Sequence, residues 1–164
     1  MNDTCESSVP GVYAVGDVNG GPQFTYISLD DFRIVFGALT GNGHYTLKDR
    51  KNIPYTTFLT PPLARVGLTE EDAINKGYTV KTKEMLVATM PRAHVNDYLK
   101  GAFKIVVNAD NDLILGATLY SQSAEELINM IKVAMDNNIP YTYFKNQIFT
   151  HPTMAENLND LCNF

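Results

Sequence analysis

The stretch THPTMAENL, residues 150–158, holds a histidine whose neighbours could support acid–base chemistry. Pro152 fixes its own φ angle and biases the preceding residue, His151, toward extended backbone. If the chain turns back at Pro152, the carboxylate of Glu156 can reach one imidazole nitrogen. That contact would fix the tautomer and leave the other nitrogen for proton transfer. His151 and Glu156 are therefore the candidate catalytic pair.

Glu156 also has a purely structural explanation. Thr153 is a good N-cap for a helix from Met154 to about Leu161, and Glu156 stands three residues later at the partner position of a capping box. A single histidine in a loop is also more often structural or solvated than catalytic. The sequence leaves open whether Glu156 binds the imidazole or caps its own helix.

A second candidate site lies in VYAVGDVNGGPQFT, near the start of the chain. Residues 12–15 are continuously apolar and predict a buried strand, which Gly16 and Asp17 end; a helix with Thr25 as its N-cap follows. A carboxylate at the end of a strand can accept hydrogen bonds from sugar-like hydroxyls, and the amides at a helix N-terminus can face an electron-rich group. The alternative is that Asp17 only forms an Asx turn.

The helix expected over residues 26–39 is apolar around most of its circumference. Asp30, Asp31 and Arg33 mark its expected solvent-facing side. A helix this apolar is expected to be covered by other parts of a protein over most of its surface.

The rest of the chain predicts an α+β fold, an antiparallel sheet flanked by helices. Residues 40–52 are polar, contain two glycines, and form a candidate connection between domains. Strands are expected in residues 56–68 (interrupted by Pro61-Pro62), 78–89, 103–107 and 113–120. Helices are expected after Thr69, after Ser123 with Glu126 completing a capping box, and at the C-terminus. Residues 141–148 are expected to form a short helix or a turn.

Composition excludes several classes of function. The net charge of -5 and pI of about 5.1 argue against a nucleic-acid surface and against an anionic membrane partner. No apolar run approaches the roughly 18 residues that span a bilayer. The histidines and cysteines form no metal-ligand cluster, so no metal is expected. Cys5 and Cys162 predict two free thiols in a reducing, cytoplasmic compartment; a redox-active Cys162 is the less favoured alternative.

Three blocks, in this order, resemble the glutathione reductase-like flavoprotein disulfide reductases. The block VPGVYAVGDVNGGPQFTYISLDDFR resembles their second flavin-contacting motif. FLTPPLARVGLTEEDA is similar to the first strand and helix of their C-terminal dimerisation domain, and HPTMAENL to their C-terminal His-Pro-Thr-x-x-Glu signature. The segment GGPQFTYISLDD resembles the corresponding segment in a bacterial branch of the family, among dihydrolipoamide dehydrogenase-like, glutathione reductase-like and mercuric reductase-like proteins.

The resemblance implies FAD and NAD(P)H as cofactors of the whole enzyme. Asp17, preceded by Gly16, would match the aspartate that hydrogen-bonds the ribityl chain of FAD. The stretch Gln23, Phe24 and Thr25 would match the helix N-terminus near the pyrimidine side of the flavin. His151 and Glu156 would match the acid–base pair that crosses a homodimer interface to serve thiol–disulfide exchange in the other subunit.

The sequence contains no G-x-G-x-x-G and no C-x-x-x-x-C. The family's redox disulfide, first FAD loop and NAD(P) loop are therefore not in it, and the chain is expected to be a C-terminal piece of a longer enzyme. Residues 1–45 would be the remnant of the FAD domain and residues 46–164 the dimerisation domain. The isolated chain is expected to be inactive and to bind no cofactor. The alternative is a stand-alone dimeric interaction module.

Overall fold

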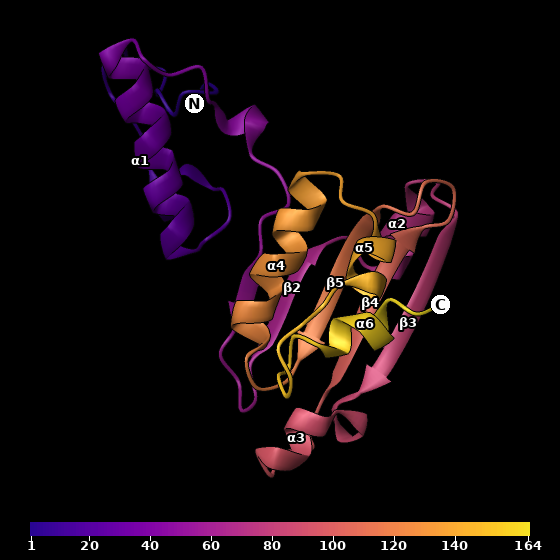
Figure 1. Ribbon diagram of the computed structural model, residues 1–164. Coiled ribbons are helices and arrows are strands. Elements are labelled where there is room, and N and C mark those ends of the chain that lie inside the picture. Colours follow the sequence, from indigo (N-terminus) through magenta and orange to yellow (C-terminus); the bar gives the residue numbers. More distant parts are fainter. The chain divides into compact units, whose positions relative to one another are not determined.

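The computed structural model describes residues 1–164, which divide into two compact units. Unit 1 comprises Met1–Lys51 and unit 2 comprises Asn52–Phe164. Figure 1 draws unit 1 in indigo and purple, and unit 2 from magenta to yellow. The assignment of residues 1–45 and 46–164 to two domains of a larger enzyme stays a prediction.

Unit 1 is built around one long helix, α1, which spans Thr25–Thr40. Phe24 has extended backbone (φ −133°, ψ 141°) and is the N-cap, so Thr25 is the first helical residue and not the expected N-cap. Gly41 ends the helix with φ 70°, a left-handed conformation that glycine adopts without a steric penalty. Two short 3₁₀ helices, η1 (Gly16–Asn19) and η2 (Leu47–Asp49), precede and follow α1.

The strand expected at residues 12–15 is wrong. Tyr13 forms a single antiparallel bridge with Glu6, and Val12 and Val15 are 52% and 42% exposed. A buried strand needs hydrogen-bonded neighbours along its length, and this segment has one bridge partner instead of a ladder.

These 164 residues do not cover the large apolar residues of α1, since Tyr26, Phe32 and Phe36 are each more than half exposed. That other parts of the protein cover them stays a prediction. A second expectation about α1 is wrong. Asp31, expected on the solvent-facing side, is completely buried. The carboxylate faces polar groups of unit 1 that donate hydrogen bonds to it, so its burial is compensated locally.

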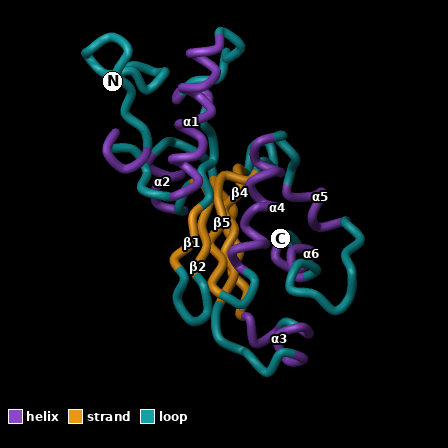
Figure 2. The backbone as a smooth tube through the Cα atoms, turned by 90° about the vertical axis from the view of Figure 1, so that its left-hand side faces the viewer, coloured by secondary structure: helices purple, strands orange, loops and turns teal.

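Unit 2 is a five-stranded antiparallel sheet with the strand order β1-β2-β5-β4-β3. The strands are β1 (Tyr55–Thr57), β2 (Leu63–Gly67), β3 (Val80–Leu86), β4 (Ala102–Asn108) and β5 (Ile114–Tyr120). Helices α4 (Ala124–Asp136), α5 (Tyr141–Asn146) and α6 (Asn157–Leu161) lie on one face of the sheet, as Figure 2 shows from the side. The predicted α+β class, an antiparallel sheet flanked by helices, is confirmed.

The core lies between the sheet and these three helices. On β4 the alternate residues Phe103, Ile105 and Val107 point inward and are at most 1% exposed. The helix expected after Ser123 is confirmed as α4, and its buried face includes Leu127 and Ile131. A period of two on the strands and of 3.6 on the helix brings both stripes to one interface.

Most turn and cap signals act as expected. Pro61-Pro62 separate the edge strand β1 from β2, and Thr69 caps α2 (Glu70–Asn75) in a capping box with Asp72. The capping box expected at Ser123 is wrong. Ser123 has φ 63° and its side chain makes no cap hydrogen bond; its carbonyl begins the helix by accepting from the Leu127 amide at 3.0 Å.

The strand expected at residues 78–89 ends earlier than expected, at Leu86. The chain then continues into η3 (Val87–Thr89) and α3 (Pro91–Val95). None of the helices in the structure has the length and apolar character needed to cross a bilayer.

The close approach of Gly101 to β5 gives a test of the sheet's packing. A Cβ on Gly101 (φ +122°) would overlap the carbonyl oxygen of Tyr120, whereas one on Gly77 (φ +85°) meets nothing within 4 Å. Gly77→Ala should cost only the left-handed conformational penalty, about 1–2 kcal/mol. Gly101→Ala should carry a similar conformational penalty and, in addition, a steric cost of about 1–3 kcal/mol. Urea unfolding of both variants measures the difference; equal losses would contradict this packing.

Candidate functional site

The predicted acid–base pair is formed in the segment between α5 and α6. His151 Nδ1 lies 2.7 Å from Glu156 Oε2. The Glu156 amide donates to Thr153 Oγ1 at 3.2 Å, so the threonine hydroxyl caps this turn without help from the Glu156 carboxylate. The structure therefore decides the question that the sequence left open: the carboxylate binds the imidazole and does not close a capping box.

Hydrogen bonds hold the backbone around this pair. The Asn159 side chain donates to the carbonyls of Phe144 (2.6 Å) and Gln147 (3.0 Å), and Thr153 Oγ1 donates to the carbonyl of Thr150 (2.7 Å). Leu158 in α6 is fully buried in the core of unit 2. We call residues 147–156 the histidine arm. Its two ends are fixed to the helical layer, so the imidazole is presented from a defined backbone.

The helix after the arm is shorter than expected. It begins at Asn157, not Met154, because Asn157 turns its buried side chain back to the carbonyls of Thr153 and Met154. These bonds satisfy carbonyl oxygens outside the regular helix and keep the turn that carries Glu156 in place.

The two side chains of the pair differ in exposure. The His151 side chain is 70% exposed and that of Glu156 only 16%. The structure gives the His151 Nε2 atom no hydrogen-bond partner, and Glu156 Oε1 is buried without one. A carboxylate on Nδ1 fixes the tautomer and stabilises an imidazolium, while Nε2 stays open to an external donor or acceptor. The geometry suits general acid–base chemistry on a group brought from outside the chain.

The second candidate site lies in unit 1, in the loop that precedes α1. Gly16 has φ +72° and is buried, and a Cβ there would lie 2.7 Å from Ser28 Oγ. Asp17 is exposed, and its carboxylate makes no hydrogen bond within the protein. The Asx turn considered for Asp17 is formed instead by Asn19, whose Oδ1 accepts from the Gly21 amide at 2.8 Å.

Gln23, Phe24 and Thr25 are exposed at the N-terminus of α1, which carries no side-chain cap. The first turn of a helix has amides without helical partners and a positive dipole end. FAD, the cofactor that the resemblance implies, has a polyhydroxyl chain and an electron-rich ring edge. An unbonded carboxylate and an uncapped helix N-terminus in one unit fit those two groups.

The sequence did not identify Asp31 and Arg50 as candidate functional residues. Asp31 accepts hydrogen bonds from the Gly16 amide (2.8 Å), Asn19 Nδ2 (2.7 Å) and Arg50 Nη2 (2.5 Å). Burial disfavours the charged guanidinium, but hydrogen bonds to Asp31 and Asp30 leave the pKa of Arg50 raised. The available signal was an adjacent pair of acids in an otherwise apolar helix, followed by arginine in a polar connection.

Both cysteines are free and buried, as expected for structural thiols, and no group of residues in the structure could hold a metal ion. Burial raises the pKa of Cys162 to about 12 and also raises that of Cys5. A reactive thiol needs a lowered pKa and access to solvent. The structure therefore disfavours a redox role for Cys162.

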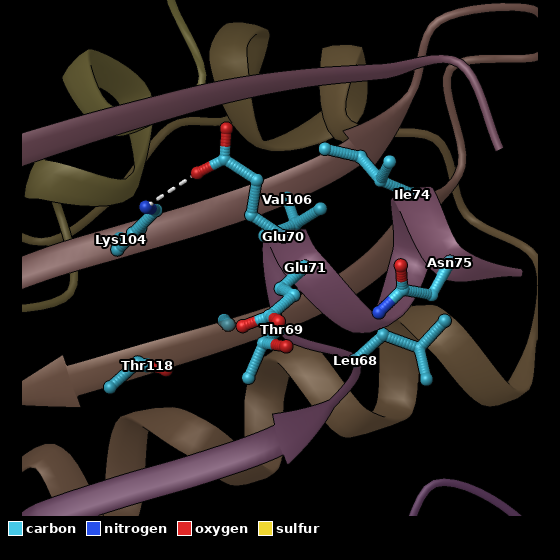
Figure 3. A pocket seen from close by; sticks show the side chains of 10 residues that line it. Leu68, Thr69, Glu70, Glu71, Ile74, Asn75, Lys104, Val106 and Thr118 are labelled. Carbon is cyan, nitrogen blue, oxygen red and sulfur yellow. Dashed lines mark hydrogen bonds and ion pairs between the residues drawn. The ribbon is translucent and has the colours of Figure 1, made fainter.

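A cavity of about 550 Å³ opens between α2 and the sheet face opposite α4 (Figure 3). Lys104 and Glu70 form an ion pair of 2.7 Å across it. None of the predicted site residues lines this cavity.

The family model described as "Pyridine nucleotide-disulphide oxidoreductase, dimerisation domain" matches residues 53–162. The chain belongs to this family. It is 47% identical over 155 residues to the probable pyridine nucleotide-disulfide oxidoreductase RclA of Escherichia coli, covering 94% of this chain. It is also 35% identical to a mercuric reductase of Staphylococcus aureus, over 96% of this chain.

Solved structures agree with this assignment. The HOCl-induced flavoprotein disulfide reductase RclA from E. coli superposes with a TM-score of 0.95 at 45% identity, covering 99% of this chain and 37% of that one. LpdA from Mycobacterium tuberculosis, 21% identical with a TM-score of 0.87, shares the fold. The chain spans 35% of the length of the curated RclA relative and 28% of the mercuric reductase.

The His151–Glu156 contact predicts one ring tautomer. Because the carboxylate accepts from Nδ1–H, neutral His151 should carry its proton on Nδ1. In ¹⁵N NMR spectra of the neutral ring, Glu156→Ala should move the population toward the Nε2–H tautomer. His44, outside the pair, serves as the internal control and should not change. An identical tautomer population in the wild type and the variant would contradict the contact.

The burial of Cys162 predicts its reactivity and its effect on stability. In a Cys5→Ala background at pH 8, the native chain should react with a thiol reagent at least about 100-fold more slowly than the urea-unfolded chain.

The pKa of Cys162 in the folded chain, about 12, lies above its value near 9.0 in the unfolded chain. Stability from the protonated thiol is therefore fully present below about pH 9 and is lost as pH rises toward 12. Cys162→Ala should remove this part of the alkaline loss; rapid native labelling would contradict the burial.

Proposed function

We propose that this chain is the C-terminal dimerisation part of an FAD- and NAD(P)H-dependent disulfide oxidoreductase. In that enzyme it supplies the His151–Glu156 pair to the active site of the partner subunit. The observation that carries the proposal is the 2.7 Å contact between His151 Nδ1 and Glu156 Oε2 on an imidazole that is 70% exposed. An acid–base group this open, held by a fixed arm, is suited to a reacting group on another polypeptide.

The chemistry of the pair is proton transfer during thiol–disulfide exchange. Exchange releases a thiolate when a disulfide bond breaks, and a thiolate leaves more easily when a proton donor or positive charge lies beside it. Protonated His151 would stabilise that thiolate or donate its Nε2 proton to it. Glu156 holds the ring in orientation and offsets the charge on the imidazolium. In the reverse direction, neutral His151 accepts the thiol proton at Nε2.

Unit 1 would contribute to the flavin site. Asp17 would accept hydrogen bonds from the ribityl hydroxyls, and the N-terminus of α1 at Gln23–Thr25 would face the electron-rich edge of the ring. FAD, when bound, supplies electron transfer between the nicotinamide and the disulfide. The isolated chain is expected to hold neither FAD nor NAD(P)H.

A homodimer is the expected assembly. The outer side of α4 exposes Met130 and Val133, which are 38% and 56% exposed and available for a second copy. Two buried free thiols fit a reducing compartment, so a cytoplasmic location is expected. A dimer of the isolated chain by light scattering, without flavin absorbance or disulfide reduction, is the expected behaviour of this part of the enzyme.

Full-length protein provides the decisive kinetic test. His151→Gln should lower kcat for disulfide reduction about 10²–10⁴-fold, the usual range for a lost general acid or base. Glu156→Gln should cause a smaller loss because the imidazole remains, less well oriented. His44→Gln, which alters an exposed histidine outside the pair, should leave kcat unchanged.

Mixed dimers test whether the pair acts across subunits. One subunit would carry His151→Gln and the other would lack the redox cysteines. If the pair serves the partner, each mixed dimer rebuilds one complete site and recovers up to about half the wild-type rate. Mixed dimers as inactive as their two parent homodimers would contradict action in trans. An unaltered kcat in His151→Gln would contradict the acid–base role of the pair. A wild-type full-length protein that reduces no disulfide would favour the alternative, a dimeric interaction module without catalysis.

A further inference from the structure

Asp31 is a completely buried charge that joins three separate segments of unit 1. From its place in α1 it accepts hydrogen bonds from the Gly16 amide, the Asn19 side chain and the Arg50 guanidinium. A buried carboxylate is stable only when its oxygens are well paired, and loss of one partner is strongly destabilising. The three donors must therefore keep their positions around the Asp31 carboxylate.

The two oxygens of Asp31 have different partners. Oδ2 accepts from the Gly16 amide at 2.8 Å and from Asn19 Nδ2 at 2.7 Å, whereas Oδ1 accepts from Arg50 Nη2 at 2.5 Å. Arg50 is itself held, because its Nε donates to Asp30 Oδ2 at 2.8 Å and its side chain is only 9% exposed. Arg50 thus occupies one oxygen of Asp31 and leaves the other for the loop.

The loop that Asp31 holds presents Asp17. Gly16 directly precedes Asp17, sits in the left-handed region at φ +72°, and is buried. Asp17 makes no side-chain hydrogen bond of its own. The position of its exposed carboxylate therefore depends on the backbone before it, and Asp31 fixes that backbone through the Gly16 amide.

We propose that Asp31 is the positioning residue of the Gly16–Asp17 loop. Asp31 does not reach the ligand; it acts through the loop, by setting where the Asp17 carboxylate stands. The inference rests on the proposed function, in which Asp17 binds the ribityl chain of FAD.

Hydrogen exchange in the 164-residue chain tests the contact without any cofactor. Asp31→Ala removes the acceptor of the Gly16 amide, so exchange at Gly16 should accelerate about tenfold or more. Asp30→Ala is the matched control: it removes one partner of Arg50 but leaves both loop contacts, and Gly16 exchange should stay within about threefold of the wild type. Amide exchange along α1, which belongs to the same unit, reports whether unit 1 stays folded in each variant.

Asp31→Leu provides a second variant, with a side chain of similar length that has no acceptor. The Gly16 amide again loses its partner, so its exchange should again rise. Unchanged exchange at Gly16 in folded Asp31→Ala or Asp31→Leu would overturn the positioning role.

The full-length protein tests the consequence for the flavin. At saturating FAD, Asp31→Ala should change the visible circular dichroism of the flavin and raise the FAD dissociation constant about tenfold, while Asp30→Ala matches the wild type. If Gly16 exchange rises but circular dichroism and affinity match the wild type, the positioning role is overturned. If the wild-type protein binds no FAD, the proposed function fails, and Gly16 exchange alone judges the contact between Asp31 and the loop.

Discussion

The hydrogen bond between His151 Nδ1 and Glu156 Oε2 can exist only if the chain reverses direction within five residues. An isolated peptide of the six residues from His151 to Glu156 would lose much conformational freedom in holding that geometry. The cost is offset in unit 2 because both ends of the histidine arm are attached to the helical layer. Asn159 donates to the carbonyl of Phe144, before the arm, and to that of Gln147, its first residue, and Leu158 anchors α6 in the core. The sheet beneath α4, α5 and α6 is the rigid base on which this contact depends.

Unit 1 holds its candidate site by a different kind of force. Here the loop before α1 is not fixed by apolar packing, since Val12 and Val15 are exposed. A buried carboxylate, Asp31, collects donors from the loop and from Arg50. Buried ion pairs contribute less net stability than apolar packing of the same volume, but they specify one geometry strongly. Such an arrangement suits a loop that must present one carboxylate, that of Asp17.

The comparisons connect the two units to one family. The dimerisation-domain match begins at residue 53, close to the division between units 1 and 2. The similarity to RclA covers 94% of this chain and so extends across most of unit 1 as well. Both candidate sites therefore lie within the part of the chain that resembles a flavoprotein disulfide reductase.

The sequence by itself determined the α+β class, the strands at 103–107 and 113–120, the helix after Ser123 and the candidate pair His151–Glu156. These features depend on local periodicity, turn residues and spacing, which the sequence states directly. It did not determine whether Glu156 caps a helix or binds the imidazole, because both uses need the same spacing. It also misplaced Asp31, since helical periodicity identifies apolar faces but not a buried acid with distant donors. Only tertiary structure brings Gly16, Asn19 and Arg50 to that carboxylate, and a buried charge is stable only where such partners meet.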